Sequence, residues 1–65
     1  MHNNIKIEKD VIYGFEPVFD KYIIIANIDH NQREVRPTHG YFIPHTYGRK
    51  VQKYAESIGY EFMQR

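Results

Sequence analysis

The chain has 65 residues, no cysteine, 15% aromatic residues and a net charge of +1. A chain of this length has a small core, so residues 1–65 are expected to form a single domain. The lack of cysteine excludes disulfides and thiolate zinc sites, which leaves packing, a partner or oligomerisation to stabilise the fold. No secretion signal precedes the first strand pattern, and no apolar run is long enough to span a bilayer. The sequence therefore predicts a soluble cytoplasmic protein without membrane contact.

Charge is unevenly distributed along the chain. Residues 1–29 carry three lysines against five acidic residues, whereas residues 30–54 carry five basic residues against one acidic residue. Three of the four histidines also fall in the middle block. Such asymmetry favours an anionic partner, unless folding disperses the charges over the surface.

The first part of the chain alternates apolar and polar residues as half-buried strands do. Ile5–Glu8 is the first expected strand, and Lys9–Asp10 forms a turn. Val11–Phe15 is the second strand, which Pro17 ends or places at a sheet edge because proline cannot donate to the ladder. A continuation through Val18–Phe19 across a bulge is the alternative.

The run Tyr22–Ile28 predicts a central strand, because β-branched residues dominate it and both of its faces are apolar over most of its length. Asp29–Gln32 follows as a polar turn, and Arg33–Arg36 as a short charged return strand that suits a protected sheet edge. If the sheet is covered on one face only, Ile23–Ile25 exposes apolar side chains to a protein partner or a second copy. The alternative is a two-sided core, with the loop after the return strand covering that face.

Proline shapes the segment that follows. Pro37 and Pro44 enforce extended backbone before them, with a turn expected at Thr38–Gly40 and a short strand at Tyr41–Ile43. The period of the apolar residues then changes to that of a helix, and one stripe contains Tyr47, Val51, Tyr54, Ala55 and Ile58.

This stripe predicts a helix over Tyr47–Ile58, with Thr46 as its N-cap and Gly59 as a left-handed residue at its C-terminus. Tyr60–Met63 alternates again and predicts a final strand. The predicted fold is α+β: a small antiparallel sheet of three to five strands, one C-terminal helix packed on one face, and then a short final strand.

The predicted helix carries a basic face opposite its apolar stripe, formed by Arg49, Lys50 and Lys53. Arg49 and Lys53 are like charges four residues apart, which destabilises a helix. Arg49 and Lys50 also lie near the helix N-terminus, where the macrodipole disfavours cations. We predict that these cations bind phosphates or a carboxylate-rich protein surface; the alternative is a solvated face that tolerates both penalties.

Other residues of the segment 36–50 complete the candidate site. Backbone geometry accounts for its prolines, and core packing for most of its apolar side chains. The predicted partner-binding residues are Arg36, His39, Tyr41, His45, Arg49, Lys50 and Lys53, with Arg33 and Tyr47 as additional contacts. An exposed tyrosine beside arginine also suits stacking on nucleic-acid bases.

The histidines raise a remote alternative. His30, His39 and His45, together with Asp29, are suitable ligands for a divalent metal, but their spacing matches no compact metal motif. Neither a metal nor another cofactor is predicted.

No pattern predicts catalysis. Ser57 is the only serine, no glycine-rich phosphate loop is present, and nothing fixes a histidine and a carboxylate in the geometry of acid–base work. The sequence therefore predicts a non-enzymatic protein that docks on a larger protein or nucleoprotein with an acidic surface and modulates or inhibits it. This type is common among small accessory proteins of phages and mobile elements. The alternative is a nucleic-acid-binding module, for which a pI near 8.0 is modest.

Overall fold

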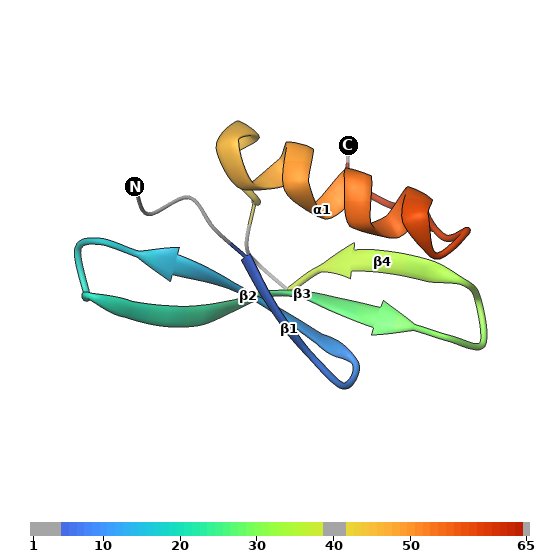
Figure 1. Cartoon of the computed structure of the whole chain (residues 1–65), viewed down its shortest axis with the longest axis horizontal. Coiled ribbons are helices and arrows are strands. Elements are labelled where there is room, and N and C mark those ends of the chain that lie inside the picture. Colours follow the sequence, from blue (N-terminus) through green and yellow to red (C-terminus); the bar gives the residue numbers. More distant parts are fainter. Residues whose placement is uncertain (1–4, 39–41, 65) are drawn as a thin grey trace.

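The computed structural model describes residues 5–38 and 42–64. It consists of a twisted five-stranded sheet with one helix lying across a single face (Figure 1). The elements are β1 (Ile5–Glu8), β2 (Val11–Glu16), β3 (Lys21–Asp29), β4 (Glu34–Pro37), α1 (His45–Ser57) and β5 (Glu61–Phe62). The predicted α+β fold with a late helix and a short final strand is confirmed.

The strands follow the order β1-β2-β3-β4-β5, and the first four are joined as antiparallel hairpins. β5 differs because it pairs with β4 in parallel, with Val35 opposite Phe62. Since α1 carries the chain back across the sheet, β5 returns in the direction of β4 and covers its outer edge. The return strand is therefore internal to the sheet, and the prediction that it forms a protected edge was wrong.

A bulge in β3 explains its continuous apolar run. Ile12 pairs with Ala26 while Tyr13 pairs with Ile24, so Ile25 is an extra residue without a cross-strand partner on β2. The extra residue reverses the alternation of faces along β3. Ile25 and Ala26 are consequently both buried under α1, although they are adjacent in the sequence.

The helix buries one stripe, formed by Tyr47, Val51 and Ala55, against the sheet. It ends in a Schellman arrangement: the Tyr60 amide donates to the Ala55 carbonyl (2.8 Å), and the Gly59 amide donates to Glu56 (3.1 Å). Gly59 has a φ of 76°, which confirms it as the left-handed terminating residue.

The start of the helix lies two residues earlier than predicted. Pro44 is the N-cap residue, its carbonyl accepts from the amides of Tyr47 and Gly48, and no side chain caps the helix. The proposed N-cap role of Thr46 was therefore wrong. Proline takes this position because its fixed φ, here −57°, directs the chain into the first turn.

Two other local predictions need correction. Pro17–Asp20 forms the turn between β2 and β3, so Val18–Phe19 does not extend the strand. Neither Phe42 nor Ile43 forms a strand: Ile43 is fully buried in the core, whereas Phe42 is 68% exposed. The rest of the predicted strand and most of the preceding turn, residues 39–41, lie outside the described residues.

The core lies between the sheet and α1. Its largest fully buried side chains are Ile12, Ile25, Ile43, Val35 and Val51. Within residues 5–38 and 42–64, no helix is long and apolar enough to cross a membrane.

Candidate functional site: the groove between α1 and β5

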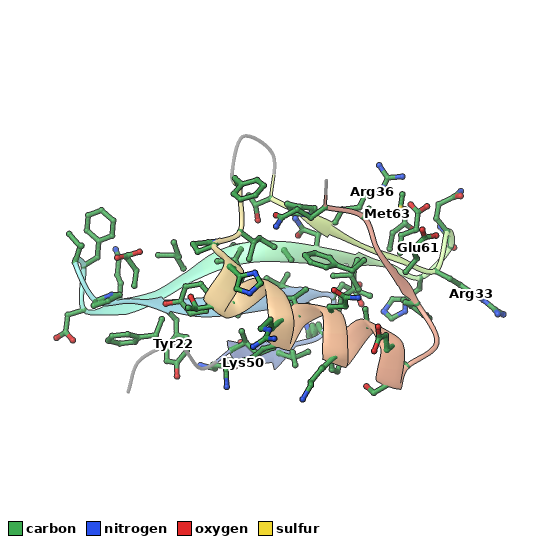
Figure 2. The ribbon with its side chains drawn as sticks, turned by 90° about the horizontal axis from the view of Figure 1, so that it is seen from above. Tyr22, Arg33, Arg36, Lys50, Glu61 and Met63 are labelled. Atoms are coloured by element: carbon green, nitrogen blue, oxygen red, sulfur yellow. The ribbon has the colours of Figure 1, made fainter. Side chains whose placement is uncertain are left out.

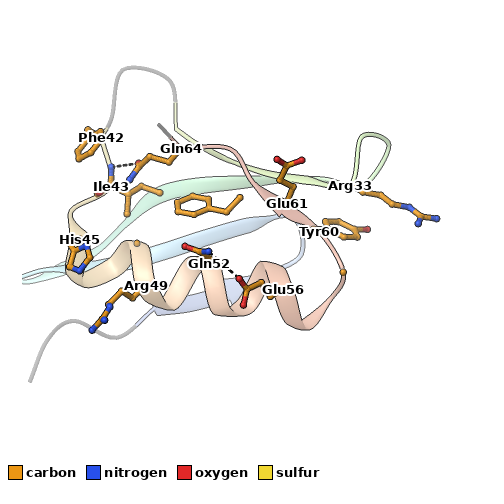
Figure 3. A pocket seen from close by; sticks show the side chains of 13 residues that line it. Arg33, Phe42, Ile43, His45, Arg49, Gln52, Glu56, Tyr60, Glu61 and Gln64 are labelled. Carbon is orange, nitrogen blue, oxygen red and sulfur yellow. Dashed lines mark hydrogen bonds between the residues drawn. The ribbon is translucent and has the colours of Figure 1, made fainter.

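A groove of about 870 Å³ separates α1 from β5 and the residues that follow it (Figure 3). The helix forms one wall with His45, Gly48, Arg49, Gln52 and Glu56. Phe62 and Gln64 form the opposite wall. Arg33, in the turn between β3 and β4, lies at the far end from His45.

Helical periodicity presents this wall to the groove. Positions 45, 49, 52 and 56 recur every three or four residues and share one face of α1, beside the buried stripe. Lys53 and Lys50 follow Arg49 around the solvent side of the helix, and a shallow depression there is lined by Arg49, Lys50, Gln52, Lys53 and Glu56. We call Arg49, Lys50 and Lys53 the cationic face; it adjoins the groove along the Arg49 edge.

The terminal turns of α1 lack the charges that would favour its macrodipole: the first turn contains no acidic residue, and the last turn contains no basic residue. Because the helix begins at His45, two residues earlier than predicted, Arg49 and Lys50 lie in its second turn. The prediction that they lie near the helix N-terminus was therefore wrong. None of the cationic-face side chains forms an ion pair with another described residue; the described ion pairs join Lys6 to Glu8, Arg36 to Glu34, and His30 to Asp10. The nearby Glu56 carboxylate accepts from the Gln52 amide (3.2 Å).

Gln64 fixes the end of the groove near the start of the helix. Its Oε1 accepts from the Ile43 amide (2.8 Å), and its Nε2 donates to the Ile43 carbonyl (3.0 Å). The side-chain amide thus pairs with backbone as a neighbouring strand would. This contact holds Phe42 at the groove with its ring exposed to solvent.

The structure gathers part of the predicted site. His45, Arg49 and Arg33 all line the groove, and Lys50 and Lys53 lie on the adjoining helix surface. His39 and Tyr41 lie outside the described residues.

Arg36 lies apart from these residues. It is on the face of the sheet away from α1, at the β4–β5 side with Glu61 and Met63, whereas Lys50 lies on the helix (Figure 2). Its guanidinium donates twice to the Glu34 carboxylate (2.6 and 2.9 Å). The hydrogen bond and then the charge of Glu34 raise the pKa of Arg36. Arg36 therefore stabilises a local ion pair and does not extend the cationic face.

Tyr47 serves the core. The residue is buried, and its hydroxyl donates to the carbonyl of Phe15. Burial raises the pKa of Tyr47 above its ordinary value of 10.0, and the negative charge of Glu16 acts in the same direction. This burial leaves little of the ring for a partner.

The histidines do not converge among the described residues. His30 lies in the turn after β3, whereas His45 begins α1, and α1 starts over the middle of the sheet, away from that turn (Figure 1). The His30 ring lies 2.7 Å from both an Asp10 oxygen and the Tyr60 hydroxyl, and so ties three turns together. Within the part of the chain that the structure describes, no three His, Cys, Asp or Glu side chains are placed to hold a metal.

The face of the sheet away from α1 carries an aromatic cluster that sequence reasoning anticipated only through Ile23–Ile25. Phe15 and Tyr22 meet edge to face at 5.5 Å, and Lys6 Nζ lies 5.5 Å from the Tyr22 ring centroid. Ile24 joins this face and is 47% exposed, whereas Ile25 packs under the helix. Among the described residues, no element covers this face (Figure 1). Its charged residues are mixed in sign: Lys6, Glu8, Glu34, Arg36 and Glu61.

The sequence did not predict three parts of the groove: that Gly48 lines its helical wall, that the ring of Phe42 is exposed beside it, and that the side chain of Gln64 hydrogen-bonds to Ile43 at its end. Gln64 is 21 residues from Ile43, and no local pattern links them. Phe42 is exposed because its neighbour Ile43 is the residue that enters the core, and tertiary packing determines which of the two does so.

The fold is thus a two-layer α+β arrangement with a groove of mixed charge on its helical side, lined by Arg33, Arg49, Glu56 and Glu61, beside the cationic face. No protein-family model matches the chain, and neither a curated protein nor a solved structure matches it.

Proposed function

We propose that this protein is a small binding module that docks on a carboxylate-rich segment of a larger protein, and thereby modulates or inhibits it. The docking surface is the cationic face of α1 together with the groove beside it. The observation that supports this proposal is the arrangement of charge on α1. Arg49 and Lys53 are like charges one helical turn apart, and no described acidic side chain forms an ion pair with either of them or with Lys50.

The like charges of Arg49 and Lys53, four residues apart on α1, destabilise the free protein by a few tenths of a kcal/mol. An acidic residue in place of either one would turn this repulsion into an attraction. A partner carboxylate placed over Arg49 offsets the repulsion, so the arrangement is stabilised in the complex.

Nucleic acid is the alternative anionic partner. Single-strand binders combine a basic channel with exposed rings. Here the most exposed aromatic cluster lies on the opposite side of the sheet from the cationic face, where Glu8, Glu34 and Glu61 are interspersed. Phe42 is an exposed ring at the groove, but the Phe15–Tyr22 pair lies on the far face. Because the ring pair is separated from the cationic face, we favour a protein partner.

The test is a fluorescence-anisotropy titration of a labelled decaglutamate peptide and of a labelled single-stranded thymidine oligonucleotide of equal charge. We expect the peptide to bind more tightly, and its affinity to fall as salt is raised from about 50 to about 300 mM. Arg49→Glu is expected to weaken peptide binding about threefold to tenfold, since it replaces an exposed attraction by a repulsion.

Lys6→Glu is the matched control, because it changes net charge equally on the far side of the sheet. It is expected to leave peptide binding nearly unchanged. Equal losses in the two variants would attribute binding to net charge alone and reject the proposed surface. Tighter binding of the oligonucleotide would favour the nucleic-acid alternative.

A further inference from the structure

We propose that the groove between α1 and β5 binds its partner as an added β-strand: an extended acidic segment pairs with the free edge of β5 and lies along the helix. This inference rests on the proposed function and specifies the form of the partner. Three observations carry it: the direction of the β5 amides, an unexplained glycine on the helix wall, and the position of the cations.

The outer edge of β5 borders the groove, which Phe62 lines. The amides of Glu61 and Met63 donate to the carbonyls of Arg33 and Val35, at 3.1 and 2.9 Å, and so point toward β4. Because backbone groups alternate along a strand, the N–H and C=O of the intervening Phe62 point away from β4. These are the groups through which an extended peptide adds to a sheet edge.

Gln64 already binds an extended backbone at one end of the groove. Two positions beyond Phe62, its side-chain amide makes two hydrogen bonds to the backbone of Ile43. These bonds involve the Gln64 side chain and not the backbone edge of β5, so they leave the edge at Phe62 to the proposed strand.

Gly48 gives the helix wall a bare backbone at this place. A Cβ at Gly48 would meet only Gln64 Nε2, at 3.9 Å, so nothing inside the described structure requires glycine here. Glycine within a helix costs roughly 0.5–1 kcal/mol relative to alanine. An extended chain passing close over the helix is a physical reason for the missing side chain, because glycine is the residue that allows close approach of backbone.

The cation at one end of the groove, Arg49, determines which side chains of the occupant are favoured there, although Glu56 and Glu61 also line the groove. In an added strand, alternate residues point toward α1, where His45 and Arg49 meet them. Carboxylates are therefore expected at these alternate positions, over the first half of the helix. Glu56 disfavours them farther along, and the intervening residues of the occupant face solvent.

The probe is a fluorescein-labelled hexapeptide of alternating glutamate and threonine, with two N-methylated forms of the same sequence. One form is methylated at the glutamate amides and the other at the threonine amides. An added strand uses only one of these two sets of N–H groups, so we expect one form to lose about tenfold or more in affinity and the other to bind as the parent does. Equal retention or equal loss in the two forms overturns strand addition.

A variant of the protein provides the second readout. Gly48→Trp fills the groove and is expected to weaken hexapeptide binding about tenfold. Thr46→Trp, an exposed helix position outside the groove, is the control for a bulky substitution and is expected to bind normally. Far-UV circular dichroism verifies the fold of both.

The outcomes separate this inference from the proposed function. If Gly48→Trp and both methylated forms bind normally while Arg49→Glu still weakens decaglutamate binding, strand addition is wrong and the docking function stands. If neither decaglutamate nor the hexapeptide binds the native protein, both proposals are wrong.

Discussion

Two glycine-to-alanine substitutions should change stability in opposite directions, because their surroundings differ. Both replacements reduce the conformational entropy of the unfolded chain by the same amount. At Gly14, a Cβ would lie 3.0 Å from Ile25 Cδ1 and 3.2 Å from its Cγ2, both in the packed core. At Gly48 the nearest atom is 3.9 Å away and belongs to the end of a flexible side chain.

We expect Gly14→Ala to destabilise the fold by about 1–3 kcal/mol, the usual cost of an extra methyl in a filled core. We expect Gly48→Ala to stabilise it by about 0.5–1 kcal/mol through helix propensity. At roughly 4–8 °C per kcal/mol for a domain of this size, thermal unfolding followed by circular dichroism resolves the two shifts. A Tm for Gly14→Ala at or above that of the native protein would refute the packing argument. A lowered Tm for Gly48→Ala would show that the glycine has a structural role, and would remove its support for a bound strand.

Three further predictions concern single residues. Tyr47→Phe should lower the free energy of unfolding by about 1 kcal/mol at pH 8, and the difference between the variant and the native protein should narrow toward pH 11. The pKa of Tyr47 is raised in the folded state, so the stabilisation by its hydroxyl is present below about pH 10 and is lost as the pH rises through the folded-state pKa. Urea unfolding at the two pH values measures this difference, and a difference that does not change with pH would contradict the role of the neutral hydroxyl. Arg33→Gly should stabilise the fold by about 0.5–1 kcal/mol, because Arg33 has a φ of 55° in the turn before β4, a left-handed conformation that glycine adopts more easily. A lower urea midpoint would show that the Arg33 side chain stabilises the fold by more than its left-handed backbone destabilises it. Gly59→Ala should destabilise the fold by about 1 kcal/mol. Its φ of 76° is the only cause, since no atom lies within 4 Å of the added Cβ. An unchanged Tm would contradict the role of Gly59 in ending the helix.

Local chemistry made much of the fold predictable. Strand Ile5–Glu8 has the predicted bounds because alternation and a following turn signal coincide there. The body of α1 and the left-handed Gly59 were predicted correctly from periodicity and from glycine's conformational freedom.

The errors arise where two local signals compete or where tertiary contact decides. Thr46 is a good capping residue, but Pro44 had already set the first turn. The bulge at Ile25 is hidden in a run that is apolar on both faces, so its alternation could not be read. The parallel pairing of β5 with β4 depends on α1, because the helix returns the chain to the end of the sheet where β4 begins.

The candidate site was predictable only on the helix. The spacing of Arg49, Lys50 and Lys53 along one helix is a property of a single element, and it predicted the cationic face from sequence. The groove itself requires α1, β5 and the Gln64–Ile43 contact together. Arg36 lies on the face of the sheet away from α1, and linear proximity to the helix does not reveal the face of a strand.

Amide chemical-shift mapping with the glutamate–threonine hexapeptide tests the central claim most directly. We predict that the largest shifts in a ¹H–¹⁵N spectrum occur at Gly48, Gln52 and Phe62, which border the groove. Shifts confined to Tyr13, Tyr22 and Ile24 would place binding on the opposite face of the sheet and contradict the assignment of the groove as the docking site.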